Sequence, residues 1–273
     1  MNNFTVRTLT GAIFVAALAT GIYLSYISFF ILFLGILILA LHEFYRLSEK
    51  TGATPNKTWG IIAATYIFSS FFLERSGVLP AKVTLGLIPL VFFIFIAELY
   101  RKKENPFQNI AFTILGLVIV GLPITLFNFF VFPDYSKGEY FPYFLFGLFI
   151  IQWASDTGAY VFGVSFGKHR LFERISPKKS WEGSIGGTAT ALGTAWLLSR
   201  VIPEVELIHW LVVGVITVVM GTFGDLVESL YKRSIDVKDS GSILPGHGGM
   251  LDRFDSIFFA APAVFVYLKL ALG

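Results

Sequence analysis

Long runs of apolar residues alternate with short polar segments along almost the whole chain. The runs are Leu9–Tyr23, Ser28–Tyr45, Thr58–Leu73, Val83–Tyr100, Ile110–Phe132, Phe141–Phe162, Gly183–Ser199, His209–Leu230 and Ser256–Leu272. Most approach the ~20 residues that an α-helix needs to cross a bilayer. A backbone in lipid must satisfy its own hydrogen bonds, so each run is predicted to be a helix. The pattern predicts an all-α, polytopic integral membrane protein with about nine transmembrane helices.

Composition supports the membrane class and removes several kinds of site. The chain has 273 residues, of which 55% are hydrophobic and 14% charged, against about 25% charged residues in a soluble domain. It has no cysteine, which excludes disulfides, thiolate catalysis and Cys-ligated metals. The four histidines lack the HExxH spacing of a zinc protease. We expect one membrane domain over residues 1–273, no soluble domain and no nucleic-acid partner.

The distribution of lysine and arginine predicts an orientation. If nine spans are placed in order, sixteen of the 21 basic residues fall on the side of the N-terminus. Basic residues concentrate on the cytoplasmic side of membrane proteins. We therefore expect a cytoplasmic N-terminus, an external C-terminus and a location in the inner (plasma) membrane. The first run is interpreted as a retained span, because no clear cleavage site follows it.

The polar segment Ser229–Asp255 lies between the last two apolar runs and is predicted to be cytoplasmic. Asp252 and Asp255 are three residues apart where the last run begins, so a helix there would project both carboxylates to one side. Asp225 lies at the end of the preceding run, on the same membrane side. Three converging carboxylates would suit a hard cation such as Mg²⁺. The alternative is ordinary interfacial salt bridges with neighbouring lysines and arginines.

The same segment interleaves its aspartates with basic residues and glycines. The basic residues are Lys232, Arg233, Lys238 and Arg253. Arginine and lysine beside a carboxylate-bound metal suit a phosphate-rich substrate, although the positive-inside rule alone also explains them. Gly248 and Gly249 permit close backbone approach to an anion or make a tight turn between helices. His247, which precedes them, either donates to a phosphate or holds the turn.

Two further stretches carry polar groups at membrane depth or at its edge. Asp156 lies inside the sixth apolar run, where an ionisable residue is a functional candidate or a hydrogen-bonded packing element. Lys178 and Lys179 precede the seventh run and either bind phosphate or snorkel to the interface. Ser180 is predicted to cap the helix that follows. Small residues at Gly183, Gly186 and Gly187 favour close helix packing.

The segment Ser229–Asp255 resembles the signature of the CDP-diacylglycerol synthase (phosphatidate cytidylyltransferase) family. The matching positions are Ser229, Lys232-Arg233, Lys238-Asp239, Pro245, His247-Gly248-Gly249, Asp252-Arg253 and Asp255. Tyr231 departs from the aliphatic residue or phenylalanine expected there. The stretches Ser155–Tyr160 and Ser176–Gly183 are also similar to this family, so the catalytic motifs lie within residues 141–273.

The resemblance implies a reaction in which CTP and phosphatidate give CDP-diacylglycerol and pyrophosphate. It also implies Mg²⁺, a monovalent cation such as K⁺ beside it, and a homodimer. We assign Asp225, Asp252 and Asp255 to the cation site. The candidates for catalysis are Lys232, Arg233, Lys238, Asp239, His247 and Arg253. The candidates for substrate binding are Ser229, Lys178, Lys179, Gly248 and Gly249.

Three other interpretations compete with this one. An ion or proton transporter would use Asp156, Asp225 and Glu228 as a relay, but the polar groups gather on one membrane side. A CDP-alcohol phosphotransferase would show a DGxxAR-type run with further aspartates, which this sequence lacks. A structural scaffold would leave the polar segment unexplained.

Overall fold

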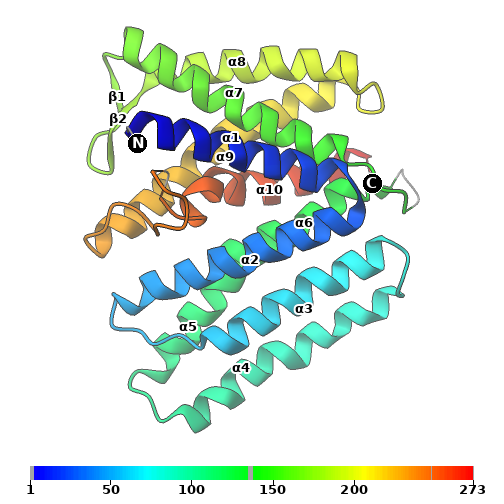
Figure 1. Ribbon diagram of the computed structural model, residues 1–273, viewed down its shortest axis with the longest axis vertical. Helices are drawn as coiled ribbons and strands as arrows, with labels where there is room; N and C mark the ends of the chain where they lie inside the picture. Colours follow the sequence, from blue (N-terminus) through cyan, green and yellow to red (C-terminus); the bar gives the residue numbers. More distant parts are fainter. Residues whose placement is uncertain (1–2, 135–137, 247, 273) are drawn as a thin grey trace. The chain divides into compact units, whose positions relative to one another are not determined.

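Helices account for most of the described chain in the computed structural model (Figure 1), which covers residues 3–134, 138–246 and 248–272. The chain divides into two compact units. Unit 1 comprises Met1–Pro142 with Ile235–Phe254, and unit 2 comprises Tyr143–Ser234 with Asp255–Gly273. Each unit is described below by itself.

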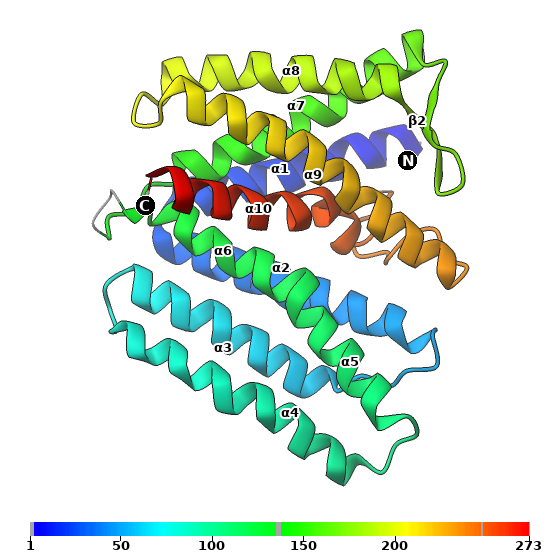
Figure 2. The same ribbon diagram turned by 180° about the vertical axis from the view of Figure 1, so that it is seen from behind.

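Unit 1 contains the first six α-helices of the chain. They are α1 (Asn3–Tyr23), α2 (Tyr26–Glu49), α3 (Lys57–Arg75), α4 (Leu87–Arg101), α5 (Pro106–Gly116) and α6 (Leu122–Val131). A 3₁₀ turn, η1 (Ala81–Gly86), leads into α4, and a π-helical turn, η2 (Leu117–Gly121), joins α5 to α6. Helix α3 packs against α2, α4 and α6, and the α3–α4 pair runs side by side in both views (Figures 1 and 2).

Helix α2 provides much of the core of unit 1. Ser25 caps its N-terminus in a capping box with Ser28. Phe29, Phe33 and Leu37 recur at helical spacing and are fully buried. The stripe continues to Tyr45, whose hydroxyl donates to Thr113 O at 2.9 Å. The buried face therefore extends along α2 to its last turns.

Unit 2 contains the remaining elements. They are α7 (Tyr143–Phe166), β1 (Arg170–Phe172), β2 (Ser176–Ser180), α8 (Trp181–Val201), α9 (Leu207–Ser234) and most of α10 (Leu251–Leu272). Helices α7, α8 and α9 pack on one another (Figure 2). The glycines of α8 make the α7–α8 contact close, because Gly183 and Gly187 are buried against the α7 backbone at Ala159 O and Ser155 O. The predicted role of these glycines in helix packing is confirmed.

The predicted all-α membrane class is confirmed, with one local correction. Each apolar run falls in a helical stretch, and within the described chain five stretches are long and apolar enough to cross a membrane. These are Tyr26–Glu49, Ala81–Arg101, Pro106–Val131, Leu207–Ser234 and Leu251–Leu272. The figure of nine spans stays a prediction. The correction is the antiparallel hairpin β1–β2, which occupies a segment interpreted only as a basic connection.

Candidate active site

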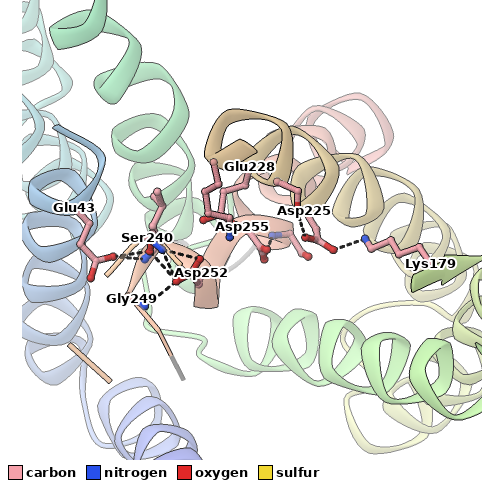
Figure 3. Close-up of polar contacts among 12 residues, drawn as sticks. Glu43, Lys179, Asp225, Glu228, Ser240, Gly249, Asp252 and Asp255 are labelled. Carbon is pink, nitrogen blue, oxygen red and sulfur yellow. Dashed lines mark hydrogen bonds and ion pairs between the residues drawn. The ribbon is translucent and has the colours of Figure 1, made fainter. Parts of the chain in front are cut away.

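The part of the signature that belongs to unit 1, Ile235–Phe254, is organised around Asp252 in the first turn of α10. Asp252 Oδ2 accepts hydrogen bonds from Gly249 N at 2.8 Å, Ser240 N at 2.9 Å and Ser240 Oγ at 2.9 Å. A carboxylate in a first helical turn is also stabilised by the helix dipole. Figure 3 shows these groups pointing toward one another. The carboxylate is thus held in one orientation by the segment that precedes its own helix.

Gly248 shapes the turn that leads into Asp252. Gly248 has φ of 85°, in the left-handed region that favours glycine. A Cβ added there would lie 2.6 Å from Asp252 Oδ2. The segment also closes on itself through Leu244 N, which donates to Gly248 O at 3.0 Å. Gly248 therefore allows the backbone to approach the Asp252 carboxylate closely.

Glu43 on α2 is a polar residue of this region that the sequence pattern did not single out. Its position near the end of the apolar run Ser28–Tyr45 is typical of an interfacial glutamate. Instead it is only 1% exposed, and its Oε2 accepts from Leu251 N at 2.9 Å and lies 3.1 Å from Ser240 Oγ. Arg46, one turn later on α2, donates from Nη2 to Ser240 O at 3.2 Å, so two polar residues one turn apart at the end of an apolar run were the available signal.

Unit 2 contains a second acidic group, in the C-terminal part of α9. Asp225 Oδ1 accepts from Ser229 Oγ at 3.3 Å, and Asp225 Oδ2 forms an ion pair with Lys179 of β2 (Figure 3). One turn later, Glu228 pairs with Lys232 at 3.1 Å. Asp255 is hydrogen-bonded to Glu228 and interacts electrostatically with Asp225. Unit 2 therefore brings together the predicted residues Asp225, Asp255, Ser229, Lys179 and Lys232.

A polar cavity of about 290 Å³ in unit 2 opens beside this group. Its walls carry the charged groups Asp156, Lys178, Lys179 and Asp225 together with Gln152. Gln152 Nε2 donates to Asp156 Oδ1 at 2.9 Å, so Asp156 is tied to its own helix. The cavity combines cationic and anionic side chains at one place, as a site for a phosphate ester with a counter-cation requires.

The hairpin that supplies the lysines is anchored at the start of α8. Ser180 caps α8 by accepting from Gly183 N at 3.1 Å, as predicted. Glu182, which precedes the apolar run of α8, lies 2.6 Å from His169 Nδ1 at the other end of the hairpin. Hydrogen bonds from backbone amides, its own first, and from the His169 side chain lower the pKa of Glu182 to about 2. Ionised Glu182 therefore ties the two ends of the hairpin together.

Arg233, Lys238, Asp239 and Arg253 are exposed, and His247 lies outside the described residues. Asp252 belongs to unit 1, whereas Asp225 and Asp255 belong to unit 2. Among the described residues, no three acidic or histidine side chains are gathered in an arrangement ready to hold a metal ion. The convergence of the three aspartates stays a prediction.

Comparison with known proteins decides the family. The pattern that defines the Cytidylyltransferase family matches residues 5–271. The chain belongs to the cytidylyltransferase family. It is 36% identical over 212 residues to proteins named phosphatidate cytidylyltransferase from Staphylococcus saprophyticus, Staphylococcus epidermidis and Staphylococcus aureus. Each alignment covers 77% of this chain and 78% of the relative. The family resemblance expected from the signature is confirmed, and the cytidylyltransferase family match makes the chain an enzyme.

Proposed function

We propose that this cytidylyltransferase makes CDP-diacylglycerol and pyrophosphate from CTP and phosphatidate. The single observation that carries the proposal is the polar cavity of unit 2, where two lysines and Asp225 meet at the end of long apolar helices. Such a site offers cations to phosphate groups while the surrounding helices stay in lipid. The names of the relatives agree with a lipid phosphate as acceptor.

The chemistry needs no nucleophile from the protein. A phosphate oxygen of phosphatidate attacks the α-phosphorus of CTP and forms a new P–O bond. The bond from the α-phosphorus to the bridging oxygen of the β-phosphate breaks, and pyrophosphate leaves with that electron pair. Reactions of this kind are accelerated mainly by positioning and by neutralising negative charge.

The basic residues are the proposed phosphate ligands. Lys178 and Lys179 line the cavity, and Lys232 lies one helical turn from Glu228 on α9. We assign the triphosphate and the lipid phosphate to these lysines together with Arg233, Lys238 and Arg253. Ser229, Gly248 and Gly249 are the proposed substrate-binding residues beside them, and Asp239 is proposed to orient the cations. His247 is proposed to donate to a phosphate.

Each unit offers carboxylate donors that suit a hard divalent cation. Asp225 and Asp255 in unit 2, and Asp252 in unit 1, present carboxylate oxygens of the kind that Mg²⁺ prefers. Bound Mg²⁺ would supply charge neutralisation at the transferring phosphoryl group. Until it binds, Lys179 offsets the charge of Asp225. K⁺ as a second ion, a homodimer, and a plasma-membrane location with the site facing the cytoplasm complete the proposal.

The proposal predicts metal-dependent synthesis of a lipid product. Purified protein in detergent, given radiolabelled CTP, phosphatidate and Mg²⁺, should transfer label to the organic phase. EDTA should stop the reaction and added Mg²⁺ should restore it. Asp252→Asn should lower turnover by at least about 100-fold, since it weakens charge stabilisation of the transferring phosphate.

The controls separate the parts of the proposal. Omitting phosphatidate should leave all label in the aqueous phase, and Asp252→Asn should elute as a folded protein in size-exclusion chromatography. Absence of labelled lipid from folded wild-type protein would refute the reaction. Turnover that is insensitive to EDTA would refute the metal, and normal turnover of Asp252→Asn would refute the role of that aspartate.

A further inference from the structure

Glu43 is a buried carboxylate without an ion pair in the described part of the chain. It is 1% exposed, its Oε1 has no hydrogen-bond partner there, and Oε2 contacts Ser240 and Leu251. Burying such a group is costly unless it is paired. A residue retained at this cost in a membrane helix is a functional candidate. All of these contacts lie within unit 1.

The contacts of Glu43 converge on Ser240, which is itself the main partner of Asp252. Ser240 donates to Asp252 through its backbone N–H at 2.9 Å and lies 2.9 Å from Asp252 through its hydroxyl. Arg46, one turn after Glu43, holds the carbonyl of Ser240. Helix α2 thus contacts both the side chain and the backbone carbonyl of Ser240. Ser240 in turn is hydrogen-bonded to Asp252.

The hydroxyl of Ser240 lies within hydrogen-bond distance of two carboxylates. Oγ is 3.1 Å from Glu43 Oε2 and 2.9 Å from Asp252 Oδ2. A serine hydroxyl has a single hydrogen to donate, so only one of the two carboxylates receives it at a time. The group at position 43 therefore influences how the hydroxyl is directed toward Asp252.

Two glycines of the signature segment make room for Glu43. A Cβ added at Gly241 would lie 2.8 Å from Glu43 Cδ, and one added at Gly249 would lie 2.7 Å from it. Real Cβ atoms do not approach so closely, and Glu43 is enclosed by the core and has little space to withdraw. The backbone of the segment is thus shaped to receive this carboxylate, which a solvent-facing glutamate would not require.

We propose that Glu43 is a positioning residue for Asp252, acting through Ser240 and Leu251. Glu43 fixes the start of α10 through Leu251 N–H and sets the direction of the Ser240 hydroxyl, and both hold the Asp252 carboxylate in its cation-binding orientation. This inference rests on the proposed function, because it takes Asp252 to be a cation ligand. It extends the site to the first half of the chain, outside the signature.

The test is direct cation binding, measured by Mn²⁺ titration with EPR on detergent-purified protein without CTP. Glu43→Ala should weaken Mn²⁺ binding by about 10–100-fold, the usual cost of losing a residue that orients a metal ligand. Ser240→Ala should weaken it in the same direction. Glu43→Gln should bind like wild type, because its amide oxygen can take the place of Oε2, where it accepts from Leu251 N–H and faces the Ser240 hydroxyl.

Glu98 supplies the matched control. It is also a buried glutamate near the end of a unit 1 helix, 5% exposed, but it pairs with Arg101 at 2.7 Å and Asn109 at 2.8 Å. Glu98→Ala should lower thermal stability and leave Mn²⁺ affinity unchanged. A merely structural role for Glu43 predicts the same behaviour for Glu43→Ala.

The outcomes separate the inference from the proposed reaction. Wild-type affinity in folded Glu43→Ala overturns the positioning role even if CTP turnover is present in the wild type. Weak binding by Glu43→Gln, equal to that of Glu43→Ala, also overturns it, because the charge itself would then matter. Failure of wild-type protein to use CTP would refute the reaction, whatever the Mn²⁺ titrations show.

Discussion

The proposed function gives the ion pair between Lys179 and Asp225 a temporary role, because each residue would change its partner on ligand binding. Their side chains are 27% and 31% exposed, and a partly solvated ion pair contributes little to stability. Both groups line the cavity of unit 2, where, on the proposed function, a phosphate would offer Lys179 a stronger partner and a cation would offer one to Asp225. On the proposed function, the pair would balance the two charges and would separate on binding of substrate and cation.

This view of the ion pair predicts a catalytic defect without loss of stability. Lys179→Met should lower kcat/KM for CTP by about 100-fold, since it removes one cation from the transferring phosphates. Lys179→Arg should retain intermediate activity, and the melting temperature of both variants should stay close to that of wild type. Turnover with radiolabelled CTP and a thermal melt in detergent measure the two effects.

Lys57 is the matched control for Lys179. It also forms an ion pair with a carboxylate, Glu49, at 2.8 Å, and its side chain is 30% exposed, but it lies in unit 1 and outside the cavity. Lys57→Met should leave kcat/KM unchanged. Equal losses in Lys57→Met and Lys179→Met would mean that activity responds to surface charge in general and not to this site.

Sequence reasoning at the residue scale succeeds where partners are near in the chain. Asp225 and Ser229 are four residues apart on one helix and therefore share a face, and the structure places Ser229 Oγ 3.3 Å from Asp225 Oδ1. The same reasoning did not identify Glu43 as part of the site, because its partner Ser240 is 197 positions away in the chain. No local pattern distinguishes a glutamate at a helix end that faces headgroups from one that turns inward to a distant loop.

At the scale of elements, apolar runs predicted the helices well and the polar connections poorly. A backbone in lipid has few alternatives to a helix, so runs such as Ser28–Tyr45 and His209–Leu230 lie inside α2 and α9. The hairpin β1–β2 has strands of three and five residues, too short and too polar for an alternating pattern. The π-helical turn η2 lies within one unbroken apolar run, which has no signal for it.

Close packing of α7 on α8 carries a prediction about stability. A Cβ at Gly186 would overlap the Cβ of Phe162 on α7, an atom that no rotamer change can move. Gly186→Ala should therefore force the helices apart, destabilise the protein by about 1–3 kcal/mol and lower its melting temperature. Gly193, on the same helix, has nothing within 4 Å of an added Cβ.

Gly193→Ala isolates the packing effect from helix propensity. Alanine stabilises a helix relative to glycine by about 1 kcal/mol, so this variant should melt at or above the wild-type temperature. If Gly186→Ala melts like Gly193→Ala, the two helices are not in the close contact described.

At the scale of the whole molecule, the signature lies on both units. The unit boundary falls between Phe254 and Asp255, so the run that supplies Asp252 to unit 1 supplies Asp255 to unit 2. Sequence spacing places the two aspartates one helical turn apart, and both lie in α10. Two of the three proposed cation ligands, Asp252 and Asp255, are therefore carried by one helix, whereas Asp225 is carried by α9.

Orientation in the membrane is the last property that the charge distribution predicts. The segment between α9 and α10 should face the cytoplasm, and the connection between α8 and α9 should face outward.

The chain has no cysteine, so single introduced cysteines report the position of each connection without background labelling. Ser242→Cys and Glu204→Cys place thiols at exposed positions in these two connections. A membrane-impermeant maleimide should label Glu204→Cys in intact cells and Ser242→Cys only after permeabilisation. Labelling of both from outside would mean that α9 does not cross the membrane. The reverse pattern would invert the predicted orientation. It would also place the lysines proposed to bind phosphate away from cytoplasmic CTP.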